Sequence, residues 1–230
     1  MISIIIPVLN EEVYVTKLIR HLQDCSSLDL VKEVLVVDGG STDGTIEKCQ
    51  DLGIKVLKGE KGRAKQMNLG ASYATGSILY FLHVDTFPPF QFDAIIKNAL
   101  RHDTEAGCFR MKFDSANSFL RLFSWFTRIN HRICRGGDQS LFITKSLFEK
   151  SGGFNEDYII YEDNEFIGRL YKGTKFRVLP YHVKTSARKY EKIGALKLQY
   201  YFGMIHLRKF LGAGPNELYQ YYQRKILAKV

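Results

Sequence analysis

Three carboxylates follow three short apolar runs in the first third of the chain. Glu11 comes soon after residues 2–8, Asp38 comes directly after residues 34–37, and Asp85 follows residues 77–82. Runs of this kind are typical of parallel strands that are covered on both faces, and open α/β sheets bind ligands outside the carboxyl ends of such strands. The sequence therefore predicts one shared cleft lined by Glu11, Asp38 and Asp85.

The segment Asp38-Gly39-Gly40 combines a carboxylate with a backbone that bends without crowding from Cβ atoms. We interpret Asp38 as facing a nucleobase or ribose, and we expect Ser41 or Thr42 to cap a helix that opens at residue 43. An ordinary turn between a strand and a helix explains Asp-Gly-Gly equally well.

The first apolar run leads into a second predicted helix. Pro7 lacks a backbone N–H, so it should lie near the end or the edge of its strand. Asn10 is expected to cap the helix, with Glu11 and Glu12 in the first turn, where the helix dipole favours negative charge. A plain strand and amphipathic helix would have the same pattern without any ligand.

His83 and Asp85 stand one residue apart at the end of the third run. This spacing suits a hard divalent cation, Mg²⁺ or Mn²⁺, that bridges a diphosphate, and Asp85 is the firmer ligand. A strand-end histidine that is hydrogen-bonded to a neighbour accounts for His83 at least as well.

Four segments in this order resemble the family-2 glycosyltransferases of the GT-A type. They are SIIIPVLNE at residues 3–11, VVDGGSTDG at 36–44, GRAKQMNLGA at 62–71 and LHVDT at 82–86. The segments GDQ at 137–139 and YEDNE at 161–165 extend the resemblance past the midpoint of the chain. Within the family the chain is most similar to short bacterial enzymes of the SAM/selenodomain-associated or arsenosugar type.

The resemblance implies a nucleotide-sugar donor and a divalent cation. The implied nucleotide site consists of Pro7, Glu11 and Asp38 around the base and ribose, Arg63 and Asn68 near the base or phosphates, and Asp85 on the metal. Many relatives carry an aspartate where this chain has His83, so the metal would be bound more weakly or in a pH-dependent manner.

An inverting transferase also needs a base that takes the proton of the acceptor hydroxyl. The family's Glu-Asp pair corresponds to Glu162 and Asp163, which precede the helical run 166–171, and we assign the base to Asp163. A capping cluster at a helix N-terminus is the alternative, because the helix dipole favours acidic residues there.

Further residues are implied by their place in the family. Gly137, Asp138 and Gln139 should line the donor-sugar and acceptor pocket, although a simple turn before a strand would look the same. Apart from the resemblance, Arg188 follows the last predicted strand, and we expect it to bring a cation to the diphosphate. His182 occupies a place where some related transferases present a late metal ligand.

The chain has 230 residues and is 45% hydrophobic, which suffices for one α/β domain. We expect a single GT-A domain with a mostly parallel central sheet and helices on both faces. Residues 1–116 would form the nucleotide-binding half, 117–190 the acceptor and catalytic half, and 191–230 a helical tail. In the tail we expect one helix over 193–211, a stop at residues 212–214, and a second helix that starts at Pro215.

The formal net charge is +9, and many cations lie in the tail among aromatic residues. Such a tail could contact anionic lipid, a phosphorylated acceptor or nucleic acid, but packing of the aromatic residues on the main domain is the preferred interpretation, and nucleic acid is disfavoured. No apolar stretch reaches the roughly 20 residues of a membrane span. The cysteines at positions 25, 49, 108 and 134 lack metal spacing, and no secretory signal is recognisable. We expect a cytoplasmic protein, with peripheral contact at the inner face of the membrane as an alternative.

Two other functional classes fit the sequence less well. A sugar-phosphate nucleotidyltransferase is disfavoured because the first strand leads into Pro-Val-Leu-Asn-Glu in place of a glycine-rich basic phosphate loop. A non-enzymatic basic module that binds nucleotides or nucleic acid would not form product from a nucleotide-sugar.

Overall fold

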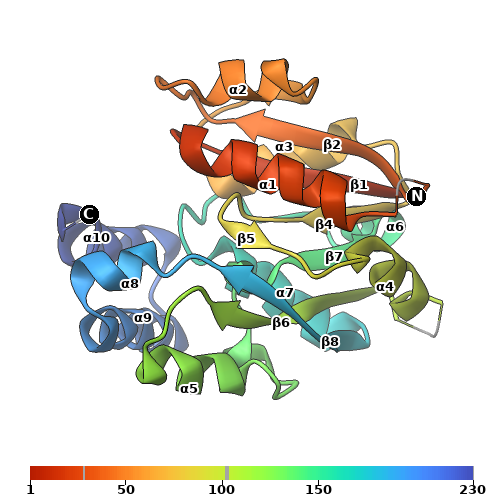
Figure 1. The fold of residues 1–230 in the computed structure, drawn as a ribbon. Coiled ribbons are helices and arrows are strands. Elements are labelled where there is room, and N and C mark those ends of the chain that lie inside the picture. The colour runs from red at the N-terminus through yellow and green to blue at the C-terminus, as the bar shows by residue number, and fades with distance from the viewer. Residues whose placement is uncertain (28, 102–103, 230) are drawn as a thin grey trace.

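The computed structural model describes residues 1–27, 29–101 and 104–229, and its centre is an eight-stranded sheet (Figure 1). The strand order is β3-β2-β1-β4-β7-β6-β8-β5. The strands are β1 (Ile2–Val8), β2 (Val31–Asp38), β3 (Lys55–Lys58), β4 (Ile78–Phe81), β5 (Thr86–Phe87), β6 (Ala106–Phe113), β7 (Leu141–Thr144) and β8 (Phe176–Thr185). The pairings within β3-β2-β1-β4 and between β6 and β8 are parallel, whereas β7 runs antiparallel to both of its neighbours and β5 runs antiparallel to β8.

Helices connect these strands and extend the chain at its C-terminal end. They are α1 (Glu12–Cys25), α2 (Thr45–Asp51), α3 (Arg63–Tyr73), α4 (Phe92–Ala99), α5 (Ser118–Phe126), α6 (Lys145–Lys150), α7 (Glu162–Gly173), α8 (Arg188–Ile193), α9 (Ala195–Phe210) and α10 (Pro215–Lys225), with short 3-10 turns η1 (Arg132–Cys134), η2 (Gly137–Gln139) and η3 (Leu227–Lys229).

Alternate residues of β1 separate two apolar cores, one on each face of the sheet. Ile4 and Ile6 pack with residues of α1 and α4, including Leu18 and Phe92. Ile5 points to the other face, where the core is made by α3, α6 and α7. Because helices cover both faces of the sheet, residues on both sides of its central strands are apolar. The prediction of helices on both faces is confirmed.

The carboxyl ends of β1 and β2 lie at one edge of the sheet, because Val8 pairs with Asp38 in register. β4 runs beside β1 in the same direction and ends at Phe81, just before His83. Pro7 is the penultimate residue of β1 and lies beyond the last pair with β4, so its missing N–H falls where we expected it. The strand ends that carry the predicted ligands are thus neighbours.

The last three helices gather at the end of the sheet toward which the arrow of β2 points in Figure 1. Their own core contains Leu198, Tyr201 and Tyr221, and it packs against residues of the segment before α7, such as Tyr158. Most tail aromatics are therefore at least partly packed, as preferred, while Tyr200 and Phe210 are exposed. Among the helices of the described residues, none is both long and apolar enough to cross a bilayer.

Helix boundaries in the tail differ partly from those expected. The predicted helix over 193–211 corresponds to α9, which covers residues 195–210. It begins two residues later than expected because Gly194, with a φ of 95°, separates it from α8, a short helix that was not predicted. Gly212, with a φ of 97°, follows α9, and Pro215 is the first residue of α10, as predicted.

Two predicted N-caps are wrong. α1 begins at Glu12 with Glu11 in the cap position, while Asn10 has a φ of 55° and accepts a hydrogen bond from the backbone of Thr42 through its side chain. α2 begins at Thr45 after Gly44, so neither Ser41 nor Thr42 caps it. The physical reason is that Asn10 and Asp38 take up the backbone N–H groups of residues 40–42, which keeps this segment out of the helix.

Candidate active site

The imidazole of His83, in the turn after β4, lies between two carboxylates. Its Nδ1 is 3.4 Å from Oδ1 of Asp138, and its Nε2 is 3.4 Å from Oδ2 of Asp163. Burial alone would lower the pKa of His83, but the interactions with Asp138 and Asp163 outweigh burial and raise this pKa to about 10. His83 is therefore an imidazolium at neutral pH, and it joins η2 to the first turn of α7.

The same contact fixes the charge of Asp138. The side chain of Asp138 is half exposed, and the hydrogen bond and the charge of His83 lower its pKa to about 2. The preceding residue, Gly137, packs directly against this group: a Cβ atom there would overlap Oδ2 of Asp163 and Cε1 of His83. The predicted acceptor-side residues Gly137 and Asp138 therefore meet the predicted base.

Glu162 and Asp163 open α7, as the acidic pattern indicated. Oε1 of Glu162 is 3.5 Å from Nη1 of Arg63, the first residue of α3. Burial and the neighbouring charge of Asp163 raise the pKa of Glu162 to about 6, although Arg63 acts in the opposite direction. Arg63 thus supplies a positive charge beside the acidic pair, and part of its side chain remains exposed for a ligand.

Arg188, the first residue of α8, brings together two of the strand-end carboxylates. Its guanidinium is hydrogen-bonded to both oxygens of Glu11, and Nη2 is 3.2 Å from Oδ2 of Asp85. The guanidinium also lies over the ring of Tyr14, 4.6 Å from its centroid. The predicted site residues Glu11, Asp85 and Arg188 therefore form one cluster.

Asp38 is buried at the end of β2, and its carboxylate accepts hydrogen bonds from the backbone of Gly40 and Ser41. Gln66 of α3 reinforces the same edge by donating to the carbonyl groups of Val8 and Val37, at 2.8 and 2.7 Å. The carboxylate of Asp38 thus orders the loop that borders the cleft. Its predicted contact with a nucleoside stays a prediction.

Two predicted binding residues are engaged in internal hydrogen bonds. The side chain of Asn68 donates to Phe154 and Glu156 and accepts from the backbone of Phe154, which anchors α3 to the segment ahead of α7. Gln139 is buried and joins Arg135 to the carbonyl group of Cys134. Both side chains position their neighbours in this structure and leave little hydrogen-bonding capacity for a nucleotide or a sugar.

His182 lies in β8, opposite Arg110 of β6. Partial burial and the positive charges of Lys112, Arg110 and Arg128 lower its pKa. A metal ion at His182 would be repelled by these three cations. This charge environment disfavours metal binding, and the role of His182 as a metal ligand stays a prediction.

Sequence reasoning missed two positioning groups. Arg135 is buried, and its guanidinium donates to the carbonyl oxygens of Thr127 and Ile129 and to Gln139, which shapes the turn before η2. Tyr161, directly ahead of the acidic pair, has a φ of 72°, and its hydroxyl is 3.0 Å from Nδ1 of His206 in α9. The Arg-Gly-Gly string was the available signal for Arg135, whereas no local pattern points to the contact between Tyr161 and His206.

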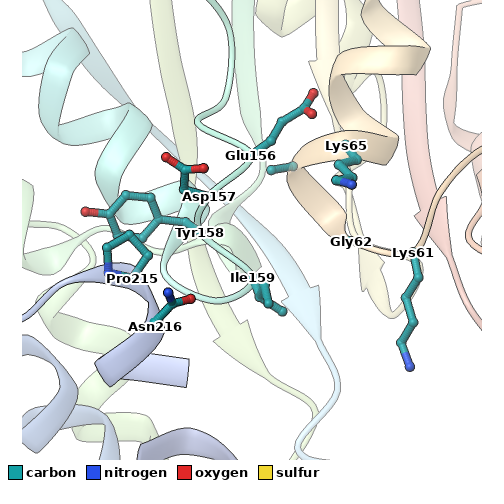
Figure 2. A pocket seen from close by; sticks show the side chains of 10 residues that line it. Lys61, Gly62, Lys65, Glu156, Asp157, Tyr158, Ile159, Pro215 and Asn216 are labelled. Carbon is teal, nitrogen blue, oxygen red and sulfur yellow. The ribbon is translucent and has the colours of Figure 1, made fainter. Parts of the chain in front are cut away.

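A hollow of about 640 Å³ opens between the start of α3 and the segment ahead of α7 (Figure 2). Lys61, Gly62 and Lys65 at the start of α3 line one side, and the segment 156–159 and the start of α10 line the other. Neither Asp85 nor the acidic pair lines this hollow. Gly62 and Ala64, which do line it, flank Arg63, the partner of Glu162.

The donor groups of the site fit a divalent cation only at Asp85. Within the residues that the structure describes, no three His, Cys, Asp or Glu side chains form a ready metal cage. Mg²⁺ is commonly held by one or two carboxylates together with substrate phosphates, so Asp85 and a bound diphosphate would suffice. His83 does not fit, because both of its ring nitrogens face carboxylates and its pKa is raised to about 10.

Comparison with known proteins identifies the family of the chain. The family model described as glycosyl transferase family 2 matches residues 3–164, more than half of the chain. The chain belongs to this family. The match contains every predicted site residue except His182 and Arg188. The subgroup within the family stays a prediction.

Curated relatives match only in part. Glycosyltransferase GlyG of Streptococcus pneumoniae is 30% identical over 92 residues, which are 37% of this chain and 30% of the relative. The 4,4'-diaponeurosporenoate glycosyltransferase of Staphylococcus haemolyticus is 36% identical over 92 residues, 36% of this chain and 24% of the relative. The chain thus matches about a quarter to a third of the length of these relatives.

Solved structures share the fold at low sequence identity. The mannosyltransferase PcManGT from Pyrobaculum calidifontis, in complex with GDP-Man and Mn²⁺, has a TM-score of 0.68 and 20% identity, covering 96% of this chain and 69% of that one. S. aureus TarS in complex with UDP-GlcNAc has a TM-score of 0.64 and 23% identity, covering 80% and 58%. The chain therefore has a GT-A fold, and the fold-class prediction is confirmed.

Proposed function

We propose that this chain is a metal-dependent inverting glycosyltransferase, which moves a sugar from a nucleotide-diphospho-sugar to a hydroxyl acceptor. The observation that carries the proposal is the contact between the carboxylate of Asp163 and the imidazole of His83. His83 lies just after β4, in the turn that also contains Asp85. A base candidate from the second half of the chain thereby contacts His83, which is two residues ahead of the metal candidate Asp85. Family membership and neighbours bound to UDP-GlcNAc and GDP-Man support this donor class.

The proposed reaction is a single displacement at the anomeric carbon. The acceptor oxygen forms a bond to that carbon, the bond from the carbon to the diphosphate oxygen breaks, and the nucleoside diphosphate leaves with the electron pair. Asp163 takes the proton of the acceptor hydroxyl. His83 holds the Asp163 carboxylate in place through the 3.4 Å contact, and Gly137 leaves room for both groups.

The remaining residues would bind the donor. Arg63 and Arg188 present guanidinium groups suited to phosphate oxygens, and Asp85 would hold the cation. When bound, a Mg²⁺ or Mn²⁺ ion supplies positive charge that stabilises the leaving diphosphate. Glu11 and the loop ordered by Asp38 would border the nucleoside.

A thermal-shift screen of nucleoside diphosphates and nucleotide-sugars, with and without Mn²⁺, tests the donor class, because a ligand of the native state raises the melting temperature. Product analysis then separates the alternatives. A glycosyltransferase releases a nucleoside diphosphate, a nucleotidyltransferase releases pyrophosphate, and a binding module releases neither. Absence of glycoside product with every donor that raises the melting temperature, across a panel of hydroxyl acceptors, would contradict the proposal.

The metal assignment has its own test by calorimetry. Asp85→Ala should remove the gain in nucleotide affinity that Mn²⁺ gives, whereas Asp38→Asn should weaken nucleotide binding with and without the metal. Metal-stimulated binding that survives in Asp85→Ala would show that another group holds the cation.

A further inference from the structure

Helix α5 turns its apolar side outward. Its residues Leu122, Trp125 and Phe126, with Ile129 in the following turn, recur at the spacing of one helical face, and they are 39–52% exposed. Leu120 is the buried residue within this helix. An amphipathic helix normally packs such a face on the core, so this face of α5 is available for an external apolar partner.

Arginines border this face. The segment 117–135 contains four arginines and neither aspartate nor glutamate, and three of the four, Arg121, Arg128 and Arg132, are exposed. The fourth, Arg135, is buried in the network described above. The exposed side of α5 therefore combines an apolar strip with a basic rim, which we call the α5 face: Arg121, Leu122, Trp125, Phe126, Arg128, Ile129 and Arg132.

The same edge of the molecule continues into α9. α5 contacts α9, and Figure 1 shows both helices along the lower edge. On α9, Leu196, Tyr200, Leu207 and Phe210 are exposed at helical spacing. Exposed apolar groups thus extend beyond α5 onto a helix that is itself rich in cations.

We propose that the α5 face is a docking surface for an anionic lipid bilayer. Exposed tryptophan and phenylalanine suit the boundary between headgroups and acyl chains, and arginines beside them attract anionic headgroups. The net charge of +9 favours the same partner. This docking does not depend on the sugar-transfer chemistry.

A second copy of the chain fits this surface less well. A two-fold interface would place the α5 face against itself, so the rim arginines of one copy would meet those of the other. No acidic residue within 117–135 could neutralise them. The charge pattern therefore favours an anionic bilayer over a second copy of the chain as the partner of this face.

The chain offers a direct probe, because Trp125 is its one tryptophan. The full chain would be mixed with vesicles of phosphatidylcholine, with and without phosphatidylglycerol, at low and high salt. Tryptophan emission should shift to the blue only with the anionic vesicles, and the protein should sediment with them. High salt should weaken both signals, because it screens the arginines.

Variants assign the binding to the α5 face. In sedimentation, Phe126→Ala should lower vesicle partitioning roughly tenfold, since burial of one aromatic side chain is lost. Arg121→Gln and Arg128→Gln should each lower it roughly fivefold. Phe90→Ala is the matched control: Phe90 is an exposed phenylalanine in the turn before α4, and its loss should change nothing. Figure 1 shows α4 and α5 apart from each other.

Three results would overturn the proposal. The first is absence of both signals with anionic vesicles. The second is binding that is insensitive to the α5 variants but lost in Phe210→Ala, which would assign the contact to α9. The third is a dimer in light scattering that Trp125→Ala dissociates, together with absence of vesicle binding, which would assign the face to a second copy.

Discussion

The guanidinium of Arg188 is hydrogen-bonded to both carboxylate oxygens of Glu11, at 2.8 and 2.5 Å, across a sequence separation of 177 residues. The same guanidinium is 3.2 Å from Asp85. In the nucleotide-free protein one cation therefore neutralises a carboxylate at each of two strand ends. A bound diphosphate would compete with Glu11 for the guanidinium of Arg188. Its metal ion would compete with Arg188 for the carboxylate of Asp85.

We expect Arg188→Ala to weaken nucleoside diphosphate binding roughly tenfold or more, because a charge-assisted contact to phosphate is lost and two carboxylates are left without a counter-charge. Arg188→Lys should recover part of the affinity, since it keeps the charge but not the two-pronged geometry. Calorimetry with the nucleotide found in the thermal-shift screen measures both. Affinity equal to wild type in Arg188→Ala would mean that Arg188 serves only to tie α8 to α1.

The assignment of the base is tested by a pair of isosteric changes. Asp163→Asn cannot accept the acceptor's proton, so turnover should fall roughly 100-fold or more while donor affinity stays near wild type. Glu162→Gln is the control, because Glu162 is held by Arg63. If Glu162→Gln is the more damaging change with donor binding intact in both, the base is Glu162; if neither change slows turnover, the acidic pair is a helix cap and the mechanism is wrong.

Gly137 allows a test of the close approach between η2 and α7. Gly137→Ala should lower both turnover and melting temperature, because the new methyl group would overlap Asp163 and His83. Gly136→Ala is a matched control one residue away, where a Cβ atom meets nothing within 4 Å. Equal activity and equal melting temperature in the two variants would show that the turn shifts freely and does not position Asp163.

Local sequence patterns predicted the parts of this fold that depend on neighbouring residues. Continuous apolar runs gave β1, β2 and β4, and the carboxylate at the end of β2 is where the pattern indicated. The starts of α7, at its acidic residues, and of α10, at Pro215, were likewise predicted from the sequence. The reason is that interactions within the first turn largely determine where a helix begins.

Contacts between distant segments were not readable in this way. Asn10 looked like an N-cap, but its side chain binds the backbone of Thr42, so a tertiary hydrogen bond overrides a local preference. The hydrogen bond between Asn68 and the backbone of Phe154 likewise joins segments that are far apart in the sequence. The position of His83 between Asp138 and Asp163 also depends on how η2 and α7 pack, which no periodicity encodes.

His83 gives a prediction for the pH dependence of stability in the metal-free protein. Its pKa is raised from an ordinary value of 6.5 to about 10 by Asp138 and Asp163, against the effects of burial and of Arg63. The folded state therefore binds the proton more tightly than the unfolded state, so the stabilisation is fully present below pH 6.5 and is lost as pH rises toward 10. Each pKa unit corresponds to about 1.4 kcal/mol, so the upper limit is a few kcal/mol.

The measurement is the free energy of unfolding from urea titrations between neutral and alkaline pH, for wild type and for His83→Gln. Lysines and tyrosines titrate in both proteins, so the difference between the two curves isolates His83. Wild type should be the more stable protein at pH 7, and the difference should shrink as the pH approaches 10. A difference that stays constant over this range would mean that His83 is neutral in the folded protein and that Asp163 is not held by an imidazolium.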